Sequence, residues 1–190
     1  MSAETGPNTG SRPAVVAVSR SSSHTFSKKS CVCITLLAGL GVEGDAHAGA
    51  KVAHRSMVKK DPEQPNLRQV HLLHVELLDE LKARGFEVYP GAIGENITTR
   101  DLDVLSLPQN TLLRVGPSAI VQVKGLRSPC RQLDDFQQGL KQAVLEHSES
   151  GELIRKSGIM GIVLESGEVR PGDEIEVILP DPPHRPLDCV

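Results

Sequence analysis

The chain has 190 residues, 38% hydrophobic and 24% charged, a profile typical of one soluble globular domain. Its net charge of −3 and its four aromatic residues argue against a basic nucleic-acid surface and against a stacking platform for single strands. No apolar run approaches the ~18 residues of a membrane span, and the polar N-terminus lacks the apolar core of a secretory signal. We therefore expect a cytoplasmic protein that binds neither membrane nor nucleic acid.

The predicted elements favour one domain over residues 14–179, between a disordered tail at 1–13 and a C-terminal tail at 180–190. Short runs rich in Val, Ile and Leu predict strands at 14–18, 32–37, 69–73, 95–99, 111–115, 119–123, 161–165 and 174–179. Helical spacing of apolar residues predicts helices over 75–85 and 133–147, the second capped by Asp134 or Asp135. This pattern indicates a mainly β domain, a closed or half-closed β-barrel with two or three peripheral helices.

A glycine-rich stretch follows the second predicted strand. Residues 39–44 read GLGVEG and match the dinucleotide-binding pattern GxGxxG. That pattern requires a helix opening at the third glycine, but the following sequence, DAHAGAKVAH, has another glycine and no helical apolar stripe. We therefore interpret these glycines as turn residues.

The four cysteines include no CxxC pair, which excludes a zinc ribbon and a thioredoxin-type motif. Cys31 and Cys33 are two positions apart in an apolar run, so alternation places them on the same face of a strand as small buried hydrophobic residues. Cys189 lies in a proline-rich tail, and we expect it to have no function there.

Cys130 differs from the other cysteines because of its neighbours. It follows a predicted strand, precedes the second predicted helix, and is flanked by Arg127 and Arg131. A thiol near a helix N-terminus and two cations should have a lowered pKa, and the thiolate is both a nucleophile and a metal ligand. The alternative, an inert buried cysteine beside two solvated arginines, is equally compatible with the residue types.

Two further segments carry polar residues among glycines. Residues 44–49 read GDAHAG, and with the basic residues that follow, His47 can supply hydrogen bonds to a phosphate; a solvated polar loop is the alternative. Residues 90–99 read PGAIGENITT, where Gly91 and Gly94 predict a sharp turn and Glu95 and Asn96 follow directly as candidates to orient a ligand.

Taken together in order, five segments resemble the MOSC domain family, named for the C-terminal domain of molybdenum cofactor sulfurases. They are GVEGDAHAG (41–49), RQVHLLH (68–74), PGAIGENITT (90–99), LRSPC (126–130) and GIMGIVLESGEVRPGDEI (158–175). The resemblance covers roughly residues 14–179 and is to the small stand-alone members, similar to hydroxylaminopurine-reducing proteins. The chain lacks the cysteine-desulfurase domain of the larger sulfurases and with it a pyridoxal phosphate site.

The resemblance implies a β-barrel of the pyruvate-kinase type and a bound molybdenum cofactor, a molybdopterin that carries molybdenum. It implies that Cys130 is the metal ligand, a soft thiolate suited to this metal, and that Asn96 is a catalytic polar group beside it. The cofactor-binding residues that it implies are His47, Arg55, Arg68, Gly94, Glu95, Asn96, Arg127 and Ser128.

The resemblance also implies an activity, the reduction of N-hydroxylated small molecules. The chain has no flavin, haem or iron–sulfur motif, so a separate reductase would supply the electrons. Two other functions stay open: a sulfur carrier that uses a Cys130 persulfide for metal-site sulfuration, and a non-catalytic module that binds or carries the cofactor.

Overall fold

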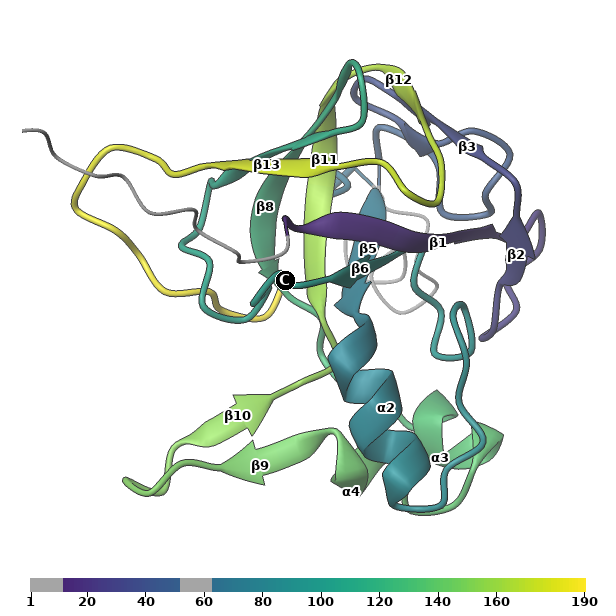
Figure 1. Cartoon of the computed structure of the whole chain (residues 1–190), viewed down its shortest axis with the longest axis vertical. Coiled ribbons are helices and arrows are strands. Elements are labelled where there is room, and N and C mark those ends of the chain that lie inside the picture. The colour runs from purple at the N-terminus through teal and green to yellow at the C-terminus, as the bar shows by residue number, and fades with distance from the viewer. Residues whose placement is uncertain (1–11, 52–62) are drawn as a thin grey trace, which may run out of the picture.

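The computed structural model describes residues 12–51 and 63–190 (Figure 1). Its helices are α2 (Val75–Ala83), α3 (Gln132–Phe136) and α4 (Leu140–Ala143). Its strands are β1 (Ala14–Arg20), β2 (Lys29–Cys31), β3 (Ile34–Leu37), β4 (Gly41–Val42), β5 (Val70–His74), β6 (Ile97–Arg100), β7 (Leu112–Val115), β8 (Ala119–Leu126), β9 (Leu145–His147), β10 (Leu153–Arg155), β11 (Ile159–Glu165), β12 (Gly167–Val169) and β13 (Ile175–Ile178). The mainly β class with a few peripheral helices is confirmed. Within the described residues, no helix is long and apolar enough to cross a membrane.

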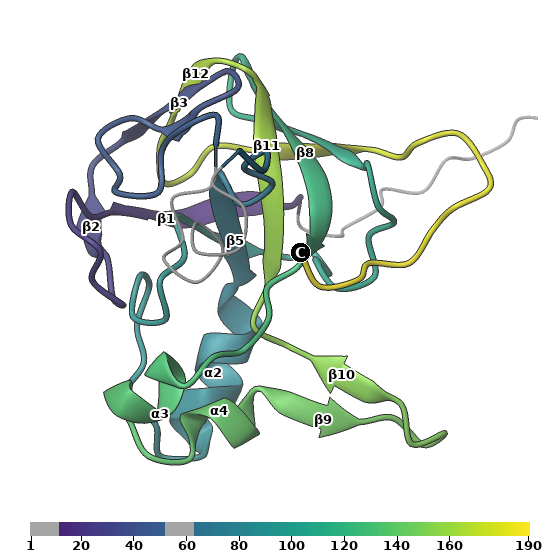
Figure 2. The ribbon, with the colours of Figure 1, turned by 180° about the vertical axis from the view of Figure 1, so that it is seen from behind.

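The main sheet has eight strands in the order β13-β7-β8-β11-β5-β6-β1-β2. All its neighbours pair antiparallel except β5 and β6, which are parallel and have α2 in the connection between them. A three-stranded sheet, β12-β3-β4, and the β9–β10 hairpin complete the fold. The strands of the main sheet form one end of the molecule, and α2, α3, α4 and the hairpin gather at the other (Figures 1 and 2).

Of the two expected forms, a closed or a half-closed barrel, the closed one is wrong, because no sheet among the described residues closes into a barrel. The two ends of the main sheet meet over a short stretch, where Ala14 and Glu174 form an isolated antiparallel bridge and three backbone hydrogen bonds join residues 13–15 to residues 172–175. The sheet does not close fully because two segments, β2 and the segment before β13, pair with the same edge of β1. Residues Val18–Arg20 of that edge pair with β2, which leaves only the start of β1 to meet the segment before β13.

Each of the eight predicted strands overlaps an observed one, whereas the predicted helix over 133–147 is wrong. That segment forms two short helices, α3 and α4, separated at Gly139, which has a φ of 87°, and its last residues form β9. The residue at the N-cap of α3 is Arg131, with no side-chain cap bond, so the predicted caps are also wrong. Asp134 instead accepts the backbone N–H of Lys141 at 3.0 Å.

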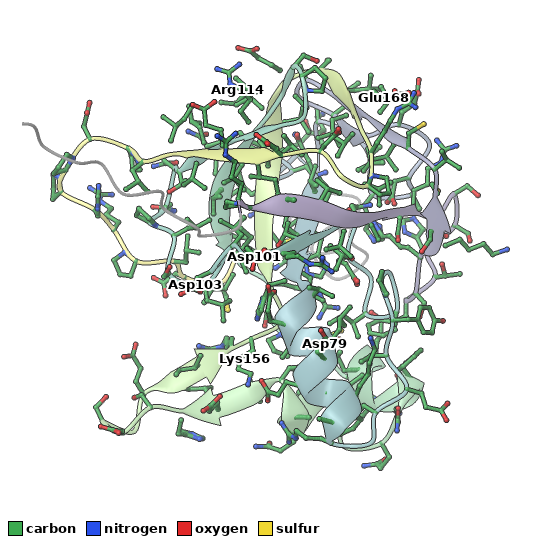
Figure 3. The ribbon with its side chains drawn as sticks, in the orientation of Figure 1. Asp79, Asp101, Asp103, Arg114, Lys156 and Glu168 are labelled. Atoms are coloured by element: carbon green, nitrogen blue, oxygen red, sulfur yellow. The ribbon has the colours of Figure 1, made fainter. Side chains whose placement is uncertain are left out.

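Two separate hydrophobic clusters stabilise the two ends of the molecule. The larger fills the sheets with residues such as Val18, Leu36, Leu72 and Val121. The smaller lies beneath the helices and contains the buried face of α2 together with Leu133 and Leu140. Lys156 ties the β9–β10 hairpin to α2 through ion pairs with Glu80 and Glu146 (Figure 3).

The prediction for Cys33 also needs correction. Strand β2 ends at Cys31, and Cys33 lies in the connection to β3, after Val32, which is 82% exposed. Alternation therefore does not continue through the pair. Cys33 is half-buried and contacts Glu168 of β12.

Candidate functional site

Cys130 lies in the segment that connects the sheet to the helices, between the end of β8 and α3. Two hydrogen bonds hold the start of this segment: the Arg127 N–H donates to the Gly158 carbonyl at 2.9 Å, and the Ser157 hydroxyl donates to the Arg127 carbonyl at 2.8 Å. Cys130 is half-buried, and its Sγ lies 3.5 Å from Oε1 of Gln132. The thiol is thus anchored at the junction of the two clusters while keeping part of its surface accessible.

Two arginines with buried guanidinium atoms surround this thiol. Arg127 contacts Cys130 and lies 5.8 Å from the centroid of the Phe26 ring, and its NH1 is buried without a hydrogen-bond partner among the described residues. Nε of Arg68 is likewise buried and unpartnered within that part of the chain. Burial lowers the pKa of both guanidinium groups, and Cys130 opposes this effect in both cases. Because guanidinium groups stay protonated in proteins, two incompletely paired cations flank the thiol. Arg131, by contrast, is exposed and pairs with Asp135.

Asp45 is the centre of a buried polar network that joins three segments. Its carboxylate accepts hydrogen bonds from the backbone of Ser21 and His47, from Nδ2 of Asn96 at 3.1 Å, and from Nζ of Lys28 at 2.7 Å. His47 Nδ1 lies 3.2 Å from the same carboxylate. Burial alone would raise the pKa of Asp45, but the hydrogen bonds from His47 and the charge and hydrogen bond of Lys28 outweigh it and hold that pKa well below its ordinary value.

Lys28 was not among the residues predicted from sequence. Its side chain is only 5% exposed, and burial lowers the pKa of its ammonium group against the opposing charge of Asp45. In sequence, Lys28 is one of two adjacent lysines, and the residue type alone indicates a solvated side chain. Only its long-range pairing with Asp45 identifies Lys28 as a residue of the site.

Asn96 links Asp45 to the sheet. Besides Asp45, its Nδ2 donates to the Ser19 carbonyl at 3.1 Å, while its Oδ1 accepts the backbone N–H of His71 at 3.2 Å. His71 is buried, and its Nε2 lies 2.8 Å from the Ser157 carbonyl. Burial, with the charge of Arg127, lowers the pKa of His71 to about 3, so the ring is neutral and Nε2–H donates.

Glu95 is fully buried at the turn that precedes Asn96. One carboxylate oxygen accepts the Gly91 N–H at 2.6 Å, and the other has no hydrogen-bond partner among the described residues. Burial raises the pKa of this carboxyl. The turn requires glycines, as predicted: Gly91 has a φ of 88° and Gly94 of 92°, and a Cβ on Gly91 would lie 2.4 Å from the Lys28 carbonyl oxygen.

The fold brings most of the sequence-predicted residues to one region. Cys130, Arg127, Arg68 and Glu95 lie close enough for their charges to interact, as the effects on the two arginine pKa values show. Electrostatic contact of Lys28 with Arg127 and Glu95 joins His47, Asn96 and the Asp45 network to this group. Ser128 is exposed. Arg55 lies outside the described residues.

The C-terminal segment also reaches the site, which the sequence did not indicate. Cys189 forms a parallel bridge with Leu126, whose N–H donates to the Asp188 carbonyl at 2.8 Å. A Cβ on Gly125 would lie 2.3 Å from that carbonyl oxygen, so this approach requires a glycine in β8. The charge of Cys189 also opposes the lowered pKa of Arg68.

Comparison with known proteins identifies the family. Residues 45–176, more than half of the chain, match the family model described as MOSC domain. The chain belongs to the MOSC domain family. Members of this family are linked to the molybdenum cofactor. The matched segment contains Asp45, His47 and Asn96 of the Asp45 network, the Glu95 turn and Cys130, whereas Ser21 and Lys28 of that network precede it.

Solved structures share the fold. The YuaD protein from Bacillus subtilis superposes with a TM-score of 0.68 at 24% identity, over 89% of this chain and 97% of that one. YiiM from Geobacillus stearothermophilus gives a TM-score of 0.61 at 20% identity, over 87% of this chain and 75% of that one. YiiM from Escherichia coli gives 0.58 at 20% identity, over 90% and 73%. No curated protein matches the sequence significantly.

Proposed function

We propose that this MOSC domain binds a molybdenum cofactor at Cys130 and reduces N-hydroxylated compounds with electrons from a separate reductase. The observation that carries the proposal is the half-buried Cys130 thiol flanked by Arg127 and Arg68, whose buried N–H groups lack partners in the described part of the chain. A soft thiolate suits a metal that already has sulfur ligands. Unpartnered buried cations suit an anionic pterin phosphate. The residues present therefore fit such a group.

In this proposal the chain holds and orients the reactants. Cys130 is the protein ligand of the metal, while Arg127, Arg68 and His47 offset the anionic charge of the cofactor. Asn96 and Asp45 position the neighbouring backbone, because Asn96, which directly precedes β6, bonds to Ser19 of β1, to His71 of β5 and to Asp45. When bound, the cofactor supplies two-electron redox chemistry. The overall conversion of a hydroxylamino group consumes two electrons and two protons and yields an amine and water.

Molybdenum and pterin content per chain is the first test. The full chain is purified from hosts with and without pterin biosynthesis, and each preparation is analysed for both components. The proposal expects near-stoichiometric molybdenum that disappears in the pterin-deficient host. Turnover of an N-hydroxylated base with an artificial one-electron donor then separates a reductase from a module that only carries the cofactor.

The Cys130→Ser variant tests the ligand assignment, with Cys33→Ser as the matched control. Both cysteines are half-buried, but Cys33 contacts Glu168 on β12, away from the arginine pair. We expect Cys130→Ser to lose molybdenum and to unfold at the same temperature as the parent chain purified from the pterin-deficient host, and Cys33→Ser to keep its molybdenum. Unchanged metal content in Cys130→Ser contradicts the assignment. If the parent chain holds no molybdenum, persulfide labelling of Cys130 tests the sulfur-carrier function.

A further inference from the structure

A large hollow lies beside the Cys130 segment, between the β1–β2 connection and α3. Its volume is about 1440 Å³, which exceeds the ~300–1,000 Å³ of common small-molecule sites. Its lining includes most residues of the segment 20–31 and, from α3, Gln132, Asp135 and Phe136. Helix α3 begins two residues after Cys130. Figure 2 shows β2 and α3 on the same side of the molecule.

The aromatic residues of this chain are concentrated at the hollow. There are only four of them in the whole sequence, and Phe26, Tyr89 and Phe136 line it. The rings of Phe26 and Phe136 lie 5.9 Å apart with an interplanar angle of 47°, and Tyr89 is 52% exposed. Phe26 and Phe136 also pack against the smaller hydrophobic cluster, so Tyr89 is the most exposed of the three rings. An exposed ring at the hollow offers a face on which a planar ligand can stack.

The hollow is cationic, although the chain as a whole is anionic. Arg20 and Lys29 line it, are exposed, and take part in none of the ion pairs found among residues 12–51 and 63–190. The charge of Lys28 is balanced by Asp45, and Asp135 is paired with Arg131. Two unbalanced positive charges thus remain in the lining.

Hydroxyl groups complete the lining. They belong to Ser21, Ser22, Ser23, Thr25, Ser27 and Ser30. Ser21, Thr25, Ser27 and Ser30 donate their hydroxyl hydrogens to backbone carbonyls and can only accept from a ligand. The donors left for phosphate oxygens are the side chains of Arg20 and Lys29 with the hydroxyls of Ser22 and Ser23, and proteins use such groups to bind phosphate. Aromatic faces, hydroxyls and cations around one hollow are therefore complementary to a planar ring that carries a phosphate.

We propose that this hollow binds a nucleoside monophosphate or a compound of that chemistry, with its ring on the aromatic wall and its phosphate at Arg20 and Lys29. Arg127 lies against the Phe26 ring and also contacts Cys130, so it connects the hollow to the Cys130 site. The use of the hollow as a substrate site therefore rests on the proposed function. The substrate class is then an N-hydroxylated base in phosphorylated form. As a binding site, the hollow is independent of cofactor content.

Calorimetry on the full chain tests the site with adenosine monophosphate as the probe, and with adenosine, ribose phosphate and inorganic phosphate as comparisons. The monophosphate should bind more tightly than each of the three, because only it engages both the rings and the cations. The double variant Arg20→Gln/Lys29→Gln should weaken its affinity about tenfold or more at low salt. The control double variant Arg114→Gln/Lys124→Gln removes the same charge from residues outside the lining, so it should bind the monophosphate like the parent chain. Arg114 lies on β7, at the end of the molecule away from the helices (Figure 3).

Tyr89 localises the binding. It is the single tyrosine, and the chain has no tryptophan, so intrinsic fluorescence reports from the hollow alone. Absorbance-corrected quenching by the monophosphate should saturate with the calorimetric affinity, in protein from either host. Absence of binding in both preparations overturns the inference and leaves the molybdenum result intact. Loss of molybdenum or pterin in Arg20→Gln/Lys29→Gln, with the monophosphate still bound normally, also overturns it, because the cations would then serve the cofactor.

Discussion

Replacing Lys28 by Met tests whether the Asp45 network stabilises the site as its geometry indicates. Nζ of Lys28 lies 2.7 Å from Oδ2 of Asp45, and the two side chains are 5% and 2% exposed. Met keeps much of the aliphatic length of the lysine but leaves the carboxylate buried without its counter-charge. Removing one partner of a buried ion pair costs about 3–5 kcal/mol.

The lower end of that range applies here. Asp45 retains the backbone donors of Ser21 and His47 and the amide of Asn96 after the change, so part of its charge remains solvated by the protein. We expect the free energy of unfolding to fall by about 3 kcal/mol, a factor of more than about a hundred in the folding equilibrium. For a chain of this length that lowers Tm by roughly 6–12 °C.

Urea and thermal unfolding at neutral pH measure the effect, with Lys29→Met as the matched control. Lys29 is exposed and forms no ion pair within the described ranges, so its replacement should change stability by less than about 0.5 kcal/mol. The double variant Lys28→Met/Asp45→Asn should recover part of the loss, because it no longer buries an unpaired charge. Equal stabilities of Lys28→Met and Lys29→Met refute the reasoning.

The pKa of Asp45 determines the direction in which folding stability changes with pH. The folded pKa of Asp45 lies below its unfolded value, so its stabilisation is present above about pH 4 and is lost as the pH falls further. Without Lys28 the carboxyl is protonated more readily in the folded chain. The difference in stability between Lys28→Met and the parent should therefore shrink in acid, which the same urea titrations measure.

Two further predictions concern residues that hold the site in place. Because the pKa of His71 is lowered to about 3, folding becomes less favourable as the pH falls below ~6.5, by up to about 1.4 kcal/mol per pH unit. The variant His71→Gln, which can still donate to the Ser157 carbonyl, should remove this pH dependence in urea titrations. An unchanged pH dependence counts against the assignment. Gly125→Ala places a Cβ against the Asp188 carbonyl and should release the C-terminal segment, so that carboxypeptidase digests it faster than in the parent; equal digestion rates mean that the contact is not needed.

Local patterns predicted the strands, the turn glycines and the position of Cys130 well. The run AIVQV predicted strand β8, and the glycines of PGAIGEN predicted a turn, in which they have positive φ values. Both features depend on local residue preferences, which the sequence shows directly. The helix over 133–147 failed because its apolar spacing continues through Gly139, where the backbone adopts the left-handed conformation and the helix stops. Periodicity alone does not register that interruption.

Long-range features escaped prediction for a different reason. Whether the sheet closes depends on how β1 divides its outer edge between β2 and the segment before β13, and no local pattern encodes that division. The burial of Lys28 depends on Asp45, and the approach of Cys189 depends on its bridge to Leu126. In each case the deciding partner is distant in sequence.

The position of the site between the two hydrophobic clusters explains why its residues are polar. Neither cluster extends across the junction, so the segments that meet there are joined by hydrogen bonds and charges instead of apolar packing. The large majority of buried polar groups in proteins are paired, and Asp45 and Asn96 are paired within the chain. Arg127, Arg68 and Glu95 keep atoms without partners among the described residues. A ligand that carries negative charge and hydrogen-bond donors would supply the partners that these three groups lack, which is the chemistry that the proposed function requires of the site.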